Sequence, residues 1–306
     1  MPIRIPDQLP ARKTLENEGV VVMDQTRSAR QDIRPLQIGL LNLMPNKERT
    51  ETQFARLVGA TPLQVDFTLV RITDHKSRNT SEKYLQTFYK TWEEVRERKF
   101  DGFIVTGAPI AHIPFEEVRY WPEMLEIMDW THTNVHHTFF ICWGAQAALH
   151  HFHGVKRHRM PEKAFGVFRH QIVNTRSPLL RGMSDSPMIP VSRYNDIDRD
   201  TITDELTVLI DNEEIGVCML EDRKFRAAYM LNHLEYDNRS LADEYHRDIA
   251  AGLETEPPVN LFPNDDPSIE PENRWRSHAH LLFQNWINEI YQTTPYDLSK
   301  VGSGGW

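Results

Sequence analysis

Residues 139–149 read Phe-Phe-Ile-Cys-Trp-Gly-Ala-Gln-Ala-Ala-Leu, and the rest of the chain is organised around this stretch. A short apolar run from Thr138 to Ile141 leads directly to Cys142, and small, helix-favouring residues follow at once. A buried strand that passes straight into a helix needs a tight reversal, and the residue at its tip takes a sparsely populated backbone conformation. Small neighbours such as Gly144 let the backbone turn that sharply. The stretch therefore predicts a nucleophile elbow with Cys142 at its tip.

A thiol at such an elbow has two chemical advantages. The positive end of the following helix stabilises the thiolate, and the adjacent backbone N–H groups can hold an oxyanion. The alternative is a buried structural thiol, because free cysteine is among the most buried residue types. The local pattern around Cys142 leaves both interpretations open.

The composition limits the class of protein. A chain of 306 residues with 40% hydrophobic content can bury a full core. Acidic residues outnumber basic ones by 44 to 35, and the net charge of -9 argues against general nucleic-acid binding, which needs a basic face. Two cysteines give no disulfide framework and fit a reducing cytosol. No apolar run approaches the roughly 20 residues of a membrane helix, and residues 1–12 lack the apolar core of a secretory signal. We therefore expect a cytoplasmic protein that binds neither nucleic acid nor membrane.

The first half of the chain alternates between strand and helix patterns. The predicted strands are 36–43, 63–72, 103–105 and 139–142, and the predicted helices are 46–57, 81–98 and 116–130. Strand and helix in alternation indicate crossover units. The expected fold class is therefore α/β, with a mostly parallel twisted sheet and helices on both faces.

The second half continues less regularly, with predicted strands at 206–211, 215–220 and 225–230 and predicted helices at 239–251 and 275–291. A proline-rich loop spans residues 256–271. Residues 1–34 look like an N-terminal arm, in which Val20–Met23 could form a short edge strand. We expect a single α/β domain over residues 35–298 and a C-terminal tail over 299–306.

Three predicted strand ends should meet at one crevice, because ligands of such sheets bind beyond the carboxyl ends of the strands. These ends are Met44-Pro45, Thr106–Pro109 and Cys142. A cysteine nucleophile needs a base, and the base needs an orienting group. His233 and Glu235 lie just past the end of the strand predicted at 225–230, so the sequence predicts a triad of Cys142, His233 and Glu235. Without Cys142, the sequence around His233 and Glu235 would indicate a solvated loop histidine and a surface carboxylate.

Several histidines invite a metal interpretation: His150, His151, His153, His158 and His170. Their spacing lacks the His-x-x-x-His pair and the companion carboxylate of a helical zinc site. A solvated helix end is favoured, and no bound metal or cofactor is expected. Cys218 lies inside an apolar run, which predicts a buried structural thiol.

Longer stretches carry a resemblance to a known family. The matching pieces are Leu41–Pro45 followed by Lys47, Thr106–Pro109, Cys142-Trp143 with Gln146–Ala148, Ser192–Tyr194, His233 with Glu235–Asp237, Trp275–His278 and Thr294–Leu298. With these in order from Met1 to about Leu298, the chain resembles the homoserine O-acyltransferases of methionine biosynthesis, in particular the homoserine O-succinyltransferase type. The resemblance implies a class I glutamine-amidotransferase-like fold.

The family's reaction is implied with the resemblance. An acyl group passes from acyl-CoA, a co-substrate, to the γ-hydroxyl of L-homoserine by a ping-pong route, which is the first committed step towards L-methionine. Cys142 would become an acyl-thioester, His233 would act as general base for the thiol and then for the hydroxyl, and Glu235 would be its partner. Lys47 would support the developing oxyanion together with backbone N–H groups near Cys142, including that of Trp143.

The resemblance also implies substrate contacts for Lys163, Ser192 and Arg247. The carboxylate of homoserine favours a bidentate arginine, for which Arg247 and Arg193 are the candidates. Its ammonium group needs an acceptor, and the sequence singles out none.

The resemblance implies that the acyl donor depends on the residue two places after Pro109. In the family, glutamate there goes with acetyl-CoA and glycine with succinyl-CoA, whereas this chain has Ala111. Alanine leaves most of the space open and adds no negative charge, and the neighbouring His112 could offer a cation. The sequence therefore favours succinyl-CoA, with acetyl-CoA as the alternative.

Two other classes of function compete with acyl transfer. A cysteine hydrolase or glutamine amidotransferase would share the elbow and the histidine, and a non-catalytic binding module would share the fold. An intact Cys142, His233 and Glu235 argues against the binding module. Serine stays open as the acceptor, since one methylene gives only about 1–3 kcal/mol of discrimination. The N-terminal arm and the Trp275–Tyr291 helix could support a homodimer, which the sequence does not decide.

Overall fold

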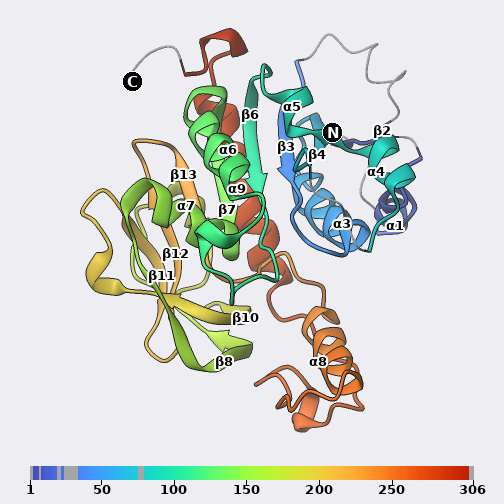
Figure 1. Ribbon diagram of the computed structural model, residues 1–306, viewed down its shortest axis with the longest axis vertical. Helices are drawn as coiled ribbons and strands as arrows, with labels where there is room; N and C mark the ends of the chain where they lie inside the picture. Colours follow the sequence, from blue (N-terminus) through green and yellow to red (C-terminus); the bar gives the residue numbers. More distant parts are fainter. Residues whose placement is uncertain (1–2, 7, 19–21, 24–33, 75–78, 303–306) are drawn as a thin grey trace.

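One large sheet runs through the computed structural model, which describes residues 3–6, 8–18, 22–23, 34–74 and 79–302 (Figure 1). Within these residues its strands follow the order β2-β1-β4-β3-β6-β7-β13-β12-β11-β9, and β5 pairs with β4. Their bounds are β1 Ile3–Arg4, β2 Val22–Met23, β3 Leu36–Leu41, β4 Val65–Arg71, β5 Lys90–Thr91, β6 Phe100–Val105, β7 Val135–Ile141, β9 Gln171–Ile172, β11 Thr207–Asn212, β12 Gly216–Asp222 and β13 Ala227–Met230. The pairs from β2 to β13 are parallel, and β12, β11 and β9 extend the sheet antiparallel. The predicted mostly parallel sheet is confirmed.

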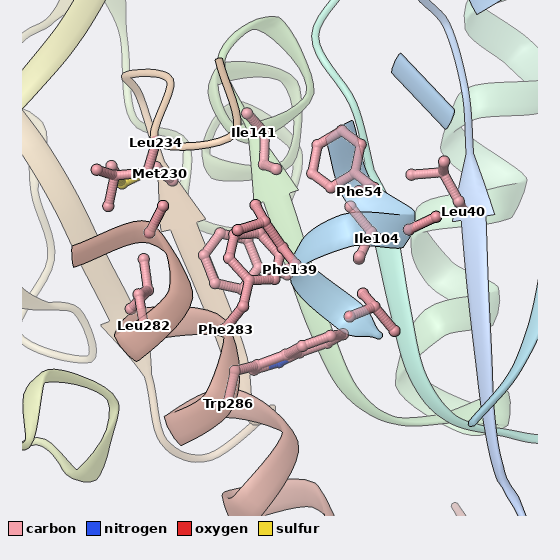
Figure 2. Close-up of a cluster of buried hydrophobic side chains, with 14 of the residues drawn as sticks. Leu40, Phe54, Ile104, Phe139, Ile141, Met230, Leu234, Leu282, Phe283 and Trp286 are labelled. Atoms are coloured by element: carbon pink, nitrogen blue, oxygen red, sulfur yellow. The ribbon is translucent and has the colours of Figure 1, made fainter. Parts of the chain in front are cut away.

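The central strands explain why helices cover both faces. Every residue of β6 and β7 is buried, as expected for parallel strands with packed layers on each side. Successive side chains of β7 alternate between two cores: Phe139 and Ile141 belong to one and Phe140 to the other. Figure 2 shows the first core, where Phe139 lies against Phe283 of α9 with ring centroids 5.2 Å apart.

The helices are α1 Ala11–Asn17, α3 Lys47–Val58, α4 Glu82–Phe88, α5 Trp92–Val95, α6 Trp121–Asn134, α7 Trp143–His153, α8 Ser240–Ala250 and α9 Arg276–Thr293. Buried residues of α3 and α9 contribute to the core of Figure 2, whereas those of α6 and α7 build the core on the opposite face. The 3-10 turns are η1 Phe115–Glu117, η2 Pro178–Leu180, η3 Arg199–Thr201, η4 Pro263–Asp265 and η5 Leu298–Lys300.

The single helix predicted over residues 81–98 is wrong. The chain leaves α4 at Tyr89, pairs briefly as β5 and restarts as α5. The restart has a local cause: Thr91 and Glu94 form a capping box, in which each side chain accepts the other's backbone N–H. The apolar stripe that suggested one helix is therefore shared between two short ones.

The N-terminal residues are partly built into the main body. β1 pairs with both β4 and β2, and Ala11 and Leu15 of α1 are buried in the core of Figure 2. Of the predicted edge strand Val20–Met23, the last two residues form β2 at the sheet margin, and the first two lie outside the described residues. The domain limits at residues 34 and 298 stay a prediction.

A second, two-stranded sheet was not predicted from the sequence. β8 (Arg157–Arg169) and β10 (Met188–Ile197) pair antiparallel, with a register shift between Arg193 and Asn195. The charged start of β8 hid its strand character. Figure 1 shows this two-stranded sheet and α8 beyond the arrowheads of β3 and β6, which is the carboxyl end of the parallel strands. In the part of the chain that the structure describes, no helix combines the length and apolarity needed to cross a membrane.

Candidate active site

The elbow predicted at Cys142 is present. β7 ends at Ile141, α7 begins at Trp143, and Cys142 between them has φ 50° and ψ -115°. A positive φ costs energy for a residue with a side chain and persists only where the surroundings enforce it. One enforcing contact is the Cys142 backbone N–H, which donates to the carbonyl of Met230 in β13 at 2.7 Å.

Two glycines make room for this turn. A Cβ on Gly144 would lie 2.7 Å from the carbonyl oxygen of Thr106, so α7 can approach the end of β6 only without a side chain there. A Cβ on Gly107 would lie 3.0 Å from the Cβ of Cys142. The Gly107 turn and the elbow therefore pack directly against each other.

His233 and Glu235 come to the elbow through the next strand. Met230, the last residue of β13, pairs with Ile141, the last residue of β7, so the chain after β13 emerges beside Cys142. The Nδ1 atom of His233 lies 2.7 Å from Oε1 of Glu235, and both side chains are buried. Tyr236 stacks on the imidazole, with centroids 4.2 Å apart and an interplanar angle of 12°. The ring is held by a carboxylate at one nitrogen and by an aromatic face.

The electrostatics favour a charged histidine. Burial lowers the pKa of His233, but charge interactions and hydrogen bonds with Glu235 and Cys142 outweigh it and raise the pKa to about 10. The imidazole therefore holds a proton at neutral pH in the free enzyme. Cys142 lies beside this ring, which is the arrangement that a cysteine nucleophile and its base require.

A cavity of about 450 Å³ opens at the elbow. Its wall includes Met44 and Pro45 after β3, Gly107 to Pro109 after β6, and Cys142, so the three predicted strand ends do converge. His233 completes this inner end. β10 and α8 also contribute to the wall, through Ser192 to Asn195 and through Glu244, Arg247 and Asp248.

A carboxylate that the sequence did not single out connects the predicted substrate-contacting residues. Oε1 of Glu244 in α8 accepts from Nζ of Lys163 at 2.6 Å and from Oγ of Ser192 at 2.8 Å. Arg247 lies one turn on, and its guanidinium donates to Asp248 while its side chain stays 68% exposed. Glu244 and Arg247 therefore place an acceptor and a cation side by side on the cavity wall. In the sequence Glu244 looked like any surface residue of an amphipathic helix.

The family model described as homoserine O-succinyltransferase matches residues 2–296. The chain belongs to this family. A relative from Pelagibacterium halotolerans named homoserine O-succinyltransferase is 77% identical over 306 residues, which is 100% of both chains. A relative from Rhizobium leguminosarum bv. trifolii named homoserine O-acetyltransferase is 60% identical over 304 residues, covering 99% of each chain. The family predicted from the sequence is confirmed, whereas these relatives carry different acyl groups in their names.

Solved structures agree on the fold. A glutamine amidotransferase from Thermotoga maritima aligns with a TM-score of 0.57 at 11% identity, covering 85% of this chain and 100% of that one. A glutamine amidotransferase from Methylobacillus flagellatus aligns with a TM-score of 0.53 at 12% identity, covering 84% of this chain and 95% of that one. The glutamine-amidotransferase-like fold predicted for this homoserine O-succinyltransferase family member is confirmed.

Two predicted site residues of this family member lie differently from expectation. Nζ of Lys47 is buried and donates to the carbonyl of Asn42. Lys47 lines a separate small cavity and is not part of the wall of the cavity that contains Cys142. Burial lowers its pKa to about 8, although Glu51 opposes the shift. Arg193 reaches the cavity wall, but its five N–H groups are directed at protein acceptors: Asn232, Asn195, Asp196, Ile215 and Val217. Arg193 therefore anchors β10, whereas the guanidinium of Arg247 stays largely exposed on the cavity wall.

The remaining predicted residues lie at the cavity. Trp143 begins α7, and its backbone N–H is one of the first-turn groups that a helix cannot satisfy internally. Ala111 is half-buried on the wall, and its carbonyl accepts from Nδ2 of Asn195 at 2.7 Å. His112 next to it is exposed.

The histidine-rich run ends α7 as expected, but it is less solvated than expected. His151 bonds to Asp129 at 2.7 Å, and His153 is almost fully enclosed, 3.3 Å from a carboxylate oxygen of Asp222. His170 is buried, and burial lowers its pKa to about 4. Among the described residues, no group of three or more His, Cys, Asp or Glu side chains is placed to hold a metal ion.

Cys218 is fully buried as predicted, and burial raises its pKa to about 12.

Proposed function

We propose that this chain transfers an acyl group from acyl-CoA to the γ-hydroxyl of L-homoserine through a thioester on Cys142, in the step that commits homoserine to L-methionine. The observation that carries the proposal is the cavity itself. Cys142 and His233, whose ring is held by Glu235, line this cavity. Glu244 and Arg247 lie side by side on the wall of the same cavity. The relatives' names agree, since both act on homoserine. The free thiols of Cys142 and Cys218 suit the cytoplasm that we propose as its compartment.

The first half-reaction acylates the enzyme. The Cys142 thiolate attacks the thioester carbonyl of acyl-CoA, and the oxyanion is held by backbone N–H groups at the start of α7, including that of Trp143. The carbon–sulfur bond to CoA then breaks, and the leaving thiolate takes the proton from His233. Free CoA and a neutral imidazole result. Little driving force is needed, because one thioester replaces another.

The second half-reaction uses the neutral imidazole. Acylation removes the negative charge on Cys142, one of the groups that raises the pKa of His233, so the histidine now becomes a base. It takes the proton from the homoserine hydroxyl as the oxygen attacks the thioester, and Cys142 leaves as a thiolate. The ester product departs, and the thiolate–imidazolium pair is restored. Glu235 holds the ring in one orientation through both steps.

Recognition of homoserine follows from the charges on the wall. Its ammonium group meets Glu244, whose carboxylate is positioned by Lys163 and Ser192. Its carboxylate meets the exposed guanidinium of Arg247. Glu244 is the acceptor that we propose for the ammonium group, for which the sequence singles out no residue.

The test of the function is thiol release with and without the acceptor. We expect steady release of CoA from acyl-CoA only when L-homoserine is present, with one acyl-homoserine formed per thiol. The second candidate is a cysteine hydrolase or amidotransferase, because a solved structure of the same fold is named as a glutamine amidotransferase. Steady thiol release without homoserine, or ammonia release from glutamine, would decide for that class and against acyl transfer.

We propose succinyl-CoA as the preferred donor. Ala111 lies on the cavity wall, and its small, uncharged side chain neither fills the acyl pocket nor repels a distal carboxylate. The 77% identical relative is named for the succinyl reaction and the 60% identical one for the acetyl reaction. We expect kcat/KM for succinyl-CoA to exceed that for acetyl-CoA by about tenfold.

The matched variant is Ala111→Glu, which fills the pocket with a carboxylate. It should lower kcat/KM for succinyl-CoA far more than for acetyl-CoA. A preference of the unmodified protein for acetyl-CoA would contradict the proposal and would mean that His112 or another neighbour closes the pocket.

The homodimer stays a prediction, and gel filtration with light scattering would test it.

A further inference from the structure

The wall of the cavity that contains Cys142 carries an arginine stacked on a tyrosine. The guanidinium of Arg159 in β8 lies 5.0 Å from the ring centroid of Tyr194 in β10. Both residues line the cavity and both are exposed, Tyr194 to 40%. The half-buried Cys142 and this exposed pair therefore line one cavity.

Arg159 differs from the other arginines on this wall. Arg193 is tied to five protein acceptors, and Arg247 is paired with Asp248. Arg157, two residues before Arg159, donates to the carbonyl of Ile113 and stacks on Phe115. Within the described residues, Arg159 makes no hydrogen bond or ion pair through its guanidinium, and its one contact of note is Tyr194. In a chain of net charge -9, an arginine without an acidic partner is available for an external anion.

Among the charged residues at the start of β8, Arg159 lies on the cavity wall. Its neighbour His158 pairs with Asp198 instead. Leu253, which is 56% exposed, adds an apolar surface to the same cavity.

We propose that Arg159 and Tyr194 bind the nucleotide end of the acyl-CoA donor, with the guanidinium on a phosphate and the tyrosine ring against the adenine. The proposal rests on the proposed function and deepens it. A guanidinium matches phosphate oxygens in charge and geometry, and an aromatic ring offers a stacking face to any base. Homoserine carries neither phosphate nor base, so the pair acts on the donor and in the first half-reaction only.

The test compares two donors that differ only in the nucleotide. One is acyl-CoA, and the other is the same acyl group as an N-acetylcysteamine thioester, which keeps the end of the pantetheine arm and lacks all phosphates. For Arg159→Ala we expect kcat/KM with acyl-CoA to fall about fivefold to tenfold, and the preference for acyl-CoA over the short thioester to fall by the same factor. Tyr194→Ala should do the same through lost stacking. Added salt should lower the preference in the unmodified protein and not in Arg159→Ala.

Arg169→Ala is the matched control, because Arg169 is an exposed arginine at the far end of the same strand and is absent from the cavity wall. It should leave the preference unchanged. An equal loss on both donors in Arg159→Ala would overturn the proposal, because Arg159 would then contact the acyl group or homoserine. No loss on either donor would also overturn it.

Direct binding separates this proposal from the proposed function. If the unmodified protein used neither donor with homoserine, the proposed function would fail, and calorimetry with CoA alone would still test the subsite. Weaker CoA binding by Arg159→Ala than by Arg169→Ala supports the subsite, and equal binding contradicts it.

Discussion

Cys142→Ala abolishes acyl transfer: we expect kcat to fall by at least about 10⁴-fold, because no atom at the elbow can carry the acyl group. The fold should survive, since alanine removes only the sulfur from a half-buried side chain. Cys142→Ser should keep a trace of activity, because a hydroxyl beside the same histidine is a weaker nucleophile. Steady-state thiol release on purified variants with matching circular dichroism spectra measures the effect.

Cys218→Ala is the control for the thiol chemistry. Cys218 is a buried cysteine in β12 whose pKa is raised to about 12, so it has no thiolate to contribute. We expect this variant to keep its acyl-transfer activity while losing some free energy of unfolding to the cavity that it leaves. If Cys142→Ala kept a tenth of the normal kcat, the covalent route would be wrong.

Removing His233 should have the second largest effect. His233→Gln loses the acid that protonates departing CoA and the base that deprotonates homoserine, so we expect kcat to fall by about 10³–10⁴-fold. His151→Gln is the matched control, because His151 lies at the far end of α7 and pairs with Asp129. Activity within tenfold of normal in His233→Gln would show that another group transfers the proton.

The same histidine predicts a pH dependence whose sign is fixed by its neighbours. Glu235 and Cys142 both raise the pKa of His233, so the ring stays protonated from acidic pH up to about pH 10 in the free enzyme. Glu235→Gln and Cys142→Ala each remove one stabilising interaction of the imidazolium and should lower the pKa. Imidazole resonances of histidine-labelled protein, assigned by their loss in His233→Gln, follow the titration. An unchanged titration in both variants would contradict the electrostatic account.

The elbow could be predicted because its signals are local. An apolar run ending at Cys142 and the small residues from Gly144 onward lie next to each other in sequence, and the positive φ follows from their order. His233 could be predicted almost as well, since it follows a strand end, and strand ends gather at one edge of a parallel sheet. In the structure, the pairing of Met230 with Ile141 brings the chain that carries His233 next to Cys142.

The other wall of the site could not be predicted, because its contacts are tertiary. Glu244 looks like a surface carboxylate until Lys163 and Ser192, from two different strands, reach it. Arg193 looked like a substrate ligand beside Ser192, and only the folded chain shows carbonyl and side-chain oxygens around its guanidinium. Lys163, Ser192 and Arg193 lie on β8 and β10, and β8 was not predicted because it begins with charged side chains.

The most direct test of the thioester route is the mass of the enzyme after it meets the donor alone. Mixed with succinyl-CoA and no homoserine, the protein should release one CoA thiol per chain in a burst and gain one succinyl group. Peptide mapping should place that group on Cys142, and added L-homoserine should remove it as the ester. A protein that gains no acyl group, yet forms the ester once both substrates are present, would show direct transfer and contradict the thioester route.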